Sequence, residues 1–113
     1  MTTWLLTGGA DADGDLAPIE GSPVTLAVDG DRVAGRAACN HYFGPLTVTG
    51  DAWSVGLVGQ TMMACDDATM ELESRFLRAL QAVDRAAEDA DGLVLTGPGL
   101  ELRFTRAPDD ERT

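Results

Sequence analysis

Two short stretches of the 113-residue chain hold the side chains that are best suited to chemistry. The first runs from Gly35 to Gly44 and the second from Thr61 to Asp66. Together they contain both cysteines, the single histidine and the single tyrosine of the sequence. Thiol catalysis, a histidine base and a disulfide must therefore all be sought in these two stretches.

Cys39 and His41 are the pair that could form a thiol nucleophile with its base. Residues two apart on a strand point to the same side, so these side chains could touch. Catalysis also requires a third group that orients the base, and no familiar nucleophile motif surrounds Cys39. A thiol-dependent protein is therefore the alternative hypothesis and not the leading one.

Zinc binding belongs to the same alternative, because Cys39, His41, Cys65 and Asp66 are all residue types that bind zinc. Structural zinc sites usually pair their ligands closely along the chain, as in C-x₂-C. Cys39 and Cys65 instead stand alone, 26 positions apart. The alternative is thus a thiol- or metal-dependent protein centred on Cys39, His41 and Cys65, whereas the leading hypothesis requires no metal or other cofactor.

An acidic run from Asp11 to Asp15 places carboxylates at every second position, as at the start of a calcium-binding loop. The complete calcium pattern has glycine at its sixth position and glutamate at its twelfth. This sequence has Leu16 and Ser22 at those places. We therefore interpret residues 8–15 as a polar, solvated loop.

A structural role explains the two stretches more simply. Cysteine is among the most buried residue types, and Asn40 is suited to a tight turn or to capping backbone amides. Cys39 and Cys65 could form a disulfide worth about 3 kcal/mol, or they could remain two buried thiols. The residues assigned to this structural motif are Cys39, Asn40, Tyr42, Gly44, Thr61 and Cys65.

Short strands must position this motif, because alternating apolar residues are repeatedly interrupted by glycine and proline turns. A mainly β, α+β fold with antiparallel hairpins is predicted. Residues 57–63 could add a further short strand. The main predicted strands are Thr3–Leu6, Val24–Val28, Arg32–Asn40, Leu46–Thr49, Ala52–Val55, Leu93–Thr96 and Leu100–Thr105.

One α-helix is predicted over about residues 66–88. Asp66 or Asp67 can cap its first turn, and Glu71 precedes Arg75 by one turn in the favourable order. An apolar stripe must pack on the sheet, because no other apolar surface is available. The stripe consists of Leu72, Phe76, Leu80, Val83 and Ala87.

The composition limits the classes of partner. The net charge is −11 and every cation is an arginine, which disfavours nucleic acid and anionic membranes as partners. No apolar run is long enough for a membrane span. We predict a single domain over residues 1–106, a disordered acidic tail over 107–113, and a monomer. The location is expected to be cytoplasmic for the chain as given, or periplasmic or extracellular if it is a mature or trimmed form.

At these residues the sequence resembles the META domain family, which includes heat-shock proteins of the HslJ type. The two cysteine blocks match its Gly-Cys-Asn and Thr-x-Met-Ala-Cys motifs, with Ala38 where the family commonly has glycine. The matching residues are Trp4 and Leu6, Ala38–Gly44, Thr61–Cys65, Glu73–Phe76 with Leu80, Leu93–Leu95 and Leu102–Phe104.

The resemblance implies a small antiparallel, barrel-like sheet with one helix packed on it. It also implies a role in stress response, cell-envelope integrity or antibiotic tolerance, and it supplies no catalytic residue or cofactor. We therefore predict a non-enzymatic binding protein whose ligand is an unidentified protein or a small apolar molecule.

Overall fold

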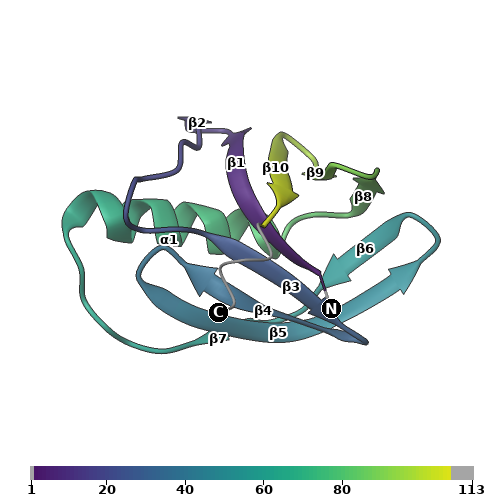
Figure 1. The fold of residues 1–113 in the computed structure, drawn as a ribbon, viewed down its shortest axis with the longest axis horizontal. Helices are drawn as coiled ribbons and strands as arrows, with labels where there is room; N and C mark the ends of the chain where they lie inside the picture. The colour runs from purple at the N-terminus through teal and green to yellow at the C-terminus, as the bar shows by residue number, and fades with distance from the viewer. Residues whose placement is uncertain (1, 108–113) are drawn as a thin grey trace.

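The computed structural model describes residues 2–107, and almost all of the acidic tail predicted over 107–113 therefore lies outside the described residues. A closed barrel of eight antiparallel strands forms its body (Figure 1). The strand order is β10-β9-β8-β6-β5-β4-β3-β1, and β10 pairs with β1 to close the ring. The strands are β1 Thr3–Asp11, β3 Thr25–Asp29, β4 Arg32–Ala37, β5 Asn40–Thr49, β6 Ala52–Val55, β8 Arg85–Glu88, β9 Gly92–Gly97 and β10 Leu100–Arg106. The predicted mainly β, barrel-like fold is confirmed.

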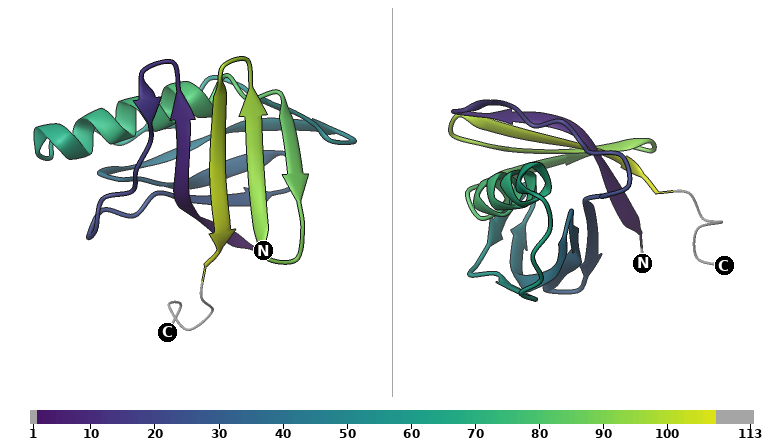
Figure 2. Two further views of the ribbon diagram at one scale, coloured as in Figure 1. Left: turned by 90° about the horizontal axis from the view of Figure 1, so that it is seen from above. Right: turned by 90° about the vertical axis from the view of Figure 1, so that its left-hand side faces the viewer.

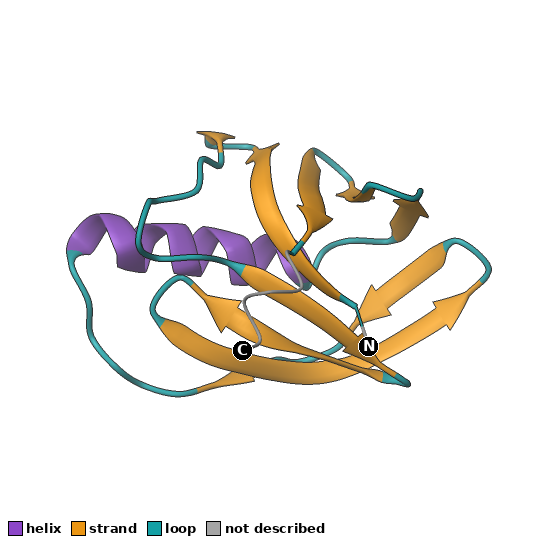
Figure 3. Ribbon diagram, viewed as in Figure 1, coloured by secondary structure: helices purple, strands orange, loops and turns teal. Residues whose placement is uncertain are grey.

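Two two-residue strands and one helix complete the architecture. Strand β2 (Gly14–Asp15) pairs with β1, and β7 (Gly59–Gln60) pairs with β5. The single helix of the described chain, α1, spans Asp67–Leu80 (purple in Figure 3). Figure 2 shows β1, β9 and β10 in one layer that crosses over the layer of β3, β4 and β5, with α1 between the two layers at one open side. Within residues 2–107, no helix is long and apolar enough to cross a membrane.

The helix begins where the sequence predicts. Asp66 is its N-cap, and the Asp66 carboxylate accepts hydrogen bonds from both the backbone N–H and the hydroxyl of Thr69, at 3.3 and 2.6 Å. These bonds hold the pKa of Asp66 below its usual value, because they stabilise the charged form. The free amides of the first helical turn are thereby partly satisfied.

The predicted helix end near residue 88 is wrong. The helix ends at Leu80, and residues 85–88 form β8, which pairs with β9 from Arg85–Thr96 to Glu88–Leu93. Val83 is buried as the stripe required, but it lies in the connection, whereas Ala87 is exposed. The edge of β9 needs a partner for its backbone groups, and this pairing overrides local helix propensity.

The predicted loop over residues 8–15 is also wrong. Strand β1 continues to Asp11 and turns tightly into β2, with Ala10 opposite Asp15. Gly9 explains the continuation, because an added Cβ there would collide with the carbonyl oxygen of Glu101 on β10. The glycines that indicated a flexible loop instead permit close strand packing.

An ion pair fastens this hairpin to the helix and explains the acidic run without calcium. Arg75 donates from Nε and Nη2 to the Asp11 carboxylate at 3.1 and 2.7 Å, and from Nη2 to the Gly14 carbonyl at 2.9 Å. The first carboxylate of the supposed calcium loop is therefore engaged by a guanidinium. Among residues 2–107, no group of three or more acidic, histidine or cysteine side chains could hold a metal ion.

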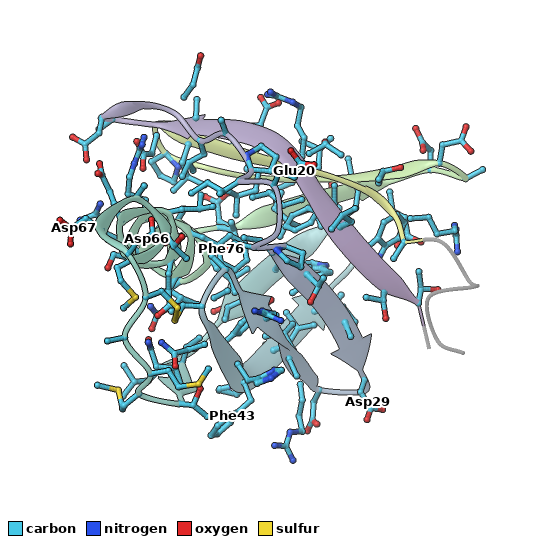
Figure 4. All side chains as sticks on the ribbon, turned by 60° about the vertical axis from the view of Figure 1, so that its left-hand side comes forward. Glu20, Asp29, Phe43, Asp66, Asp67 and Phe76 are labelled. Atoms are coloured by element: carbon cyan, nitrogen blue, oxygen red, sulfur yellow. A yellow bond between two sulfur atoms is a disulfide. The ribbon has the colours of Figure 1, made fainter. Side chains whose placement is uncertain are left out.

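Side chains fill the barrel interior. Phe76 points from α1 into the core and is fully buried, with its ring 5.6 Å from that of Tyr42 and 6.4 Å from that of Phe104 (Figure 4). The part of the predicted stripe that lies on α1, namely Leu72, Phe76 and Leu80, is thus buried against the sheet, as predicted. The largest fully buried side chains are Tyr42, Phe76, Leu6, Leu16, Leu26, Leu80, Leu93, Leu95, Leu102, Glu73, Val24 and Val33.

Replacing Phe76 with alanine is expected to lower the free energy of unfolding by about 3–5 kcal/mol, because it leaves a cavity between helix and sheet. Phe43→Ala is the matched control: Phe43 is 51% exposed, and its loss should cost less than about 1 kcal/mol. Urea denaturation followed by circular dichroism measures both values. Equal losses in the two variants would contradict the packing described.

The Asp11–Arg75 pair predicts a specific loss of stability in acid. The hydrogen bonds from Arg75 lower the pKa of Asp11, so the pair stabilises the fold fully above the unfolded value of about 4. This contribution disappears as the pH falls through the lowered folded pKa. Wild type should therefore lose more stability than Asp11→Asn between about pH 5 and pH 2 in urea denaturation. Asp13→Asn is the control, since Asp13 is 70% exposed. Parallel pH profiles of wild type and Asp11→Asn would refute the prediction.

Candidate functional site

The two cysteine-containing stretches meet at a buried carboxylate, that of Glu73 on α1, which is 2% exposed. Glu73 Oε1 accepts hydrogen bonds from the backbone N–H groups of Cys39 and Asn40 at 3.2 and 2.7 Å. Its Oε2 accepts from Asn40 Nδ2 at 2.8 Å and from Gln60 Nε2 at 2.9 Å. No cation of the described chain forms an ion pair with it. Four uncharged donors therefore replace the water that the carboxylate has lost.

Asn40 extends this network to the second stretch. Its Oδ1 accepts from the Thr61 hydroxyl at 2.9 Å and from the Met63 N–H at 2.6 Å. Its Nδ2 donates to the Met63 carbonyl at 3.1 Å as well as to Glu73. One buried amide thus holds the segment that precedes α1 in place, and the backbone amide that it caps, Met63 N–H, lies 23 positions away along the chain.

A tight turn aims the two amides at Glu73. Ala38 and Cys39 connect β4 to β5, with Ala37 opposite Asn40. Ala38 has φ 73°, a left-handed conformation that costs alanine on the order of 1 kcal/mol. This is the position at which the resembled family commonly has glycine. The turn forms with alanine nonetheless, and its conformation brings consecutive N–H groups onto one carboxylate oxygen.

The two sulfurs are joined to each other. Cys39 and Cys65 form a disulfide with an S–S distance of 2.04 Å. Cys39 is buried whereas Cys65 lies on the exposed segment before the helix. Neither sulfur is available as a thiolate, and no metal-binding group exists within residues 2–107. A thiol- or metal-dependent protein centred on Cys39, His41 and Cys65 is therefore not favoured.

The remaining motif residues make structural contacts. Tyr42 is buried, its hydroxyl donates to the Thr25 carbonyl at 2.7 Å, and burial raises its pKa. A Cβ on Gly44 would lie 3.1 Å from Val58 Cγ2, so the two segments pack closely there. His41 is exposed, and its backbone N–H donates to the Thr61 hydroxyl at 3.1 Å. Hydrogen bonds and the disulfide thus bring Cys39, Asn40, Thr61 and Cys65 together, and Tyr42 contacts α1 through Phe76. Gly44 instead packs against Val58.

Sequence reasoning missed the role of Glu73. It appeared only as part of the family resemblance, although one signal was present. Glu73 lies between Leu72 and Phe76 on the apolar side of the helix, where a charged residue is rarely found unless it is paired. Gln60 is the second side chain that donates to Glu73. It lies just before the second cysteine-containing stretch, and nothing in the sequence indicated a role for it.

Glu73→Gln is expected to lower the free energy of unfolding by about 2–3 kcal/mol, because an amide nitrogen would face groups that are themselves donors. Glu71→Gln on the exposed side of the same helix is the matched control and should change stability by less than about 0.5 kcal/mol. Guanidinium denaturation followed by tryptophan fluorescence gives both values. A near-neutral Glu73→Gln would mean that the carboxylate is not the organising acceptor.

Reducing the Cys39–Cys65 disulfide is expected to lower the free energy of unfolding by about 3 kcal/mol, because the unfolded chain regains the freedom of the closed loop. The barrel should survive, since the hydrogen bonds to Glu73 and Asn40 do not depend on sulfur. Urea denaturation with and without a dithiol reductant measures the change, and the Cys39→Ala/Cys65→Ala variant should not respond to the reductant. Coincident curves for oxidised and reduced wild type would contradict a stabilising bond.

Comparison with known proteins finds the same fold in solved structures. The solution structure of a protein from Burkholderia xenovorans is similar to the chain, with 30% identity, a TM-score of 0.80, and coverage of 94% of this chain and 81% of that one. Two further structures share the fold alone. One is a protein solved by NMR, with 15% identity, a TM-score of 0.69, and coverage of 92% of this chain and 87% of that one. The other is a DUF4847 family protein from Bacteroides vulgatus, with 11% identity, a TM-score of 0.65, and coverage of 91% of this chain and 90% of that one.

The search of curated proteins found no match to this chain. The family model of the META domain matches residues 1–109, which include both cysteine blocks, the helix with Glu73 and the closing strands. This confirms the resemblance found in the sequence, and the chain belongs to the META domain family.

Proposed function

We propose that this META domain is a non-enzymatic binding protein that docks a partner protein on the outer surface of β4, β5 and residues 57–63. The observation that carries the proposal is where the exposed apolar side chains lie. Five large hydrophobic residues are exposed in the described chain, and all five belong to β5 or to residues 57–63. Their exposed fractions are Phe43 51%, Leu57 88%, Met62 87% and Met63 54%, and the fifth is Val48 at 48%.

Residues 57–63 run alongside β5, because β7 pairs with it at Tyr42 and Phe43. We call the surface that comprises Phe43, Leu57, Met62 and Met63 the Phe43 face. Phe43 lies opposite Gly59 of β7, and a Cβ on Gly59 would lie 2.9 Å from Phe43 Cζ. Leu57 and Phe43 line one shallow hollow. Figure 4 shows Phe43 pointing outward, away from the helix and the core. Clustered exposed apolar side chains are typical of protein-interaction surfaces.

The polar centre supports a binding role over an enzymatic one. Within residues 2–107, every buried side-chain nitrogen and oxygen has a hydrogen-bond partner. The disulfide engages the sulfur of Cys39, the candidate nucleophile, and four hydrogen bonds occupy the carboxylate of Glu73. These groups are therefore best explained as the support of the adjacent Phe43 face.

A protein is favoured over a small apolar ligand as the partner. Small barrels that bind one ligand keep an interior space for it, whereas here Tyr42, Phe76 and a set of leucines fill the interior. We propose a stress-response or cell-envelope setting for the interaction. The disulfide supports an exported form of the protein over a cytoplasmic one, because such bonds persist in oxidising compartments.

The test begins with a photo-crosslinking amino acid at position 43 in the native host, followed by purification of the crosslinked protein. Binding of that protein is then measured by calorimetry with wild type, Phe43→Ser and Val48→Ser. Val48 lies on the same strand with nearly the same exposure, 48% against 51%, so Val48→Ser is the matched control. We expect Phe43→Ser to weaken binding about tenfold or more and Val48→Ser to leave it unchanged. Equal binding by wild type and Phe43→Ser would overturn the proposal.

A further inference from the structure

We propose that the Phe43 face recognises an acidic extended segment of its partner, in which two carboxylates flank an apolar side chain. This inference rests on the function proposed above and specifies the chemistry of the partner. It follows from two arginines that pair with no acidic side chain of residues 2–107.

Most arginines of the described chain are engaged elsewhere. Arg106 lies over the Trp4 ring at 5.2 Å and donates to the Ala90 carbonyl at 3.3 Å. Four others form ion pairs with carboxylates, namely Arg75, Arg78, Arg85 and Arg103. Arg32 and Arg36 form no ion pair within residues 2–107, although the whole chain has 19 acidic residues.

Both unpaired arginines flank Phe43. On β4, the exposed residues are Arg32, Ala34 and Arg36, which lie opposite Pro45, Phe43 and His41 of β5. The phenyl ring therefore stands between two cations along the same sheet surface. Arg36 donates from Nε to the Ala38 carbonyl at 3.2 Å, which orients its guanidinium.

Two acidic residues close to Arg32, Asp29 and Asp31, do not form an ion pair with it. Asp29 lies opposite Arg32 in the β3–β4 register, at the end of the hairpin, and Asp31 lines the hollow beside Phe43 and Leu57. Neither carboxylate is within ion-pair distance of Arg32. A carboxylate from a partner could therefore pair with each arginine without displacing an existing partner.

Spacing along the strand suggests the pattern of the partner. Arg32 and Arg36 are four residues apart on β4, which corresponds to about 13 Å in extended backbone. An extended peptide alternates its side chains with the same period. The matching sequence is therefore acid–x–apolar–x–acid, with the apolar side chain against Phe43 and the acids against the two arginines.

A protein segment fits better than nucleic acid. The net charge of −11 would repel a long phosphate backbone over most of the surface. A short acidic segment meets only the local cations and can use the aliphatic surface of Leu57, Met62 and Met63. Such charge pairs contribute mainly to specificity and association rate.

The test is a selection of short random peptides displayed on phage against wild-type protein, with counter-selection against Phe43→Ser. Synthetic versions of the selected peptides are then titrated against wild type, Arg32→Gln/Arg36→Gln and the control Arg85→Gln/Arg103→Gln. The control removes the same charge at exposed positions elsewhere. Circular dichroism verifies folding of every variant.

We expect acidic residues to be enriched on both sides of an apolar position. Binding should weaken about tenfold or more in Arg32→Gln/Arg36→Gln, remain unchanged in the control, and weaken with added salt. Peptides that depend on Phe43 but not on the two arginines would overturn this inference and leave the proposed function standing. A selection that yields no Phe43-dependent peptide would count against both. Single-stranded oligothymidine is titrated in parallel. If it binds more tightly than the peptides and its binding requires Phe43, the inference is overturned and the partner of this surface is a nucleic acid.

Discussion

A carboxylate buried without a cation is the constraint on which this structure depends. Glu73 accepts four hydrogen bonds from the β4–β5 turn, from Asn40 and from Gln60. Removing a charge from water is costly unless donors replace the lost hydration, so these segments must come together when the helix docks. The Cys39–Cys65 disulfide joins two of the same segments covalently. Polar and covalent links therefore enforce one arrangement of the helix against the barrel.

This internal arrangement also determines what the surface presents. Asn40 fixes Thr61 and Met63 through its side-chain oxygen, and the disulfide fixes Cys65. The segment that carries the exposed methionines is thereby held beside Asn40 and His41, on the strand that carries Phe43. A preorganised apolar surface loses little conformational entropy on binding. Under the function proposed above, the family motif supports a binding surface to which its own segments contribute Phe43, Met62 and Met63.

Much of the fold could be predicted from local sequence, because turn glycines, strand alternation and the Asp66 cap act over a few residues. The helix end could not, because the spacing of Leu80 and Val83 fits a helix equally well, and the choice is made by the open edge of β9. Glu73 was not recognised as the acceptor of the Cys39 and Asn40 amides in the predicted motif. That contact joins residues more than 30 positions apart. Local patterns in a single sequence do not indicate which distant residues will meet.

The most direct measurement is native-state hydrogen exchange at the amides of Cys39 and Asn40, followed by NMR. Both lie at a hairpin end, where amides usually exchange rapidly through local opening. If Glu73 holds them as described, they should exchange only through global unfolding, as slowly as amides in the middle of β10. Exchange at rates typical of an exposed turn would contradict the central role of the buried carboxylate.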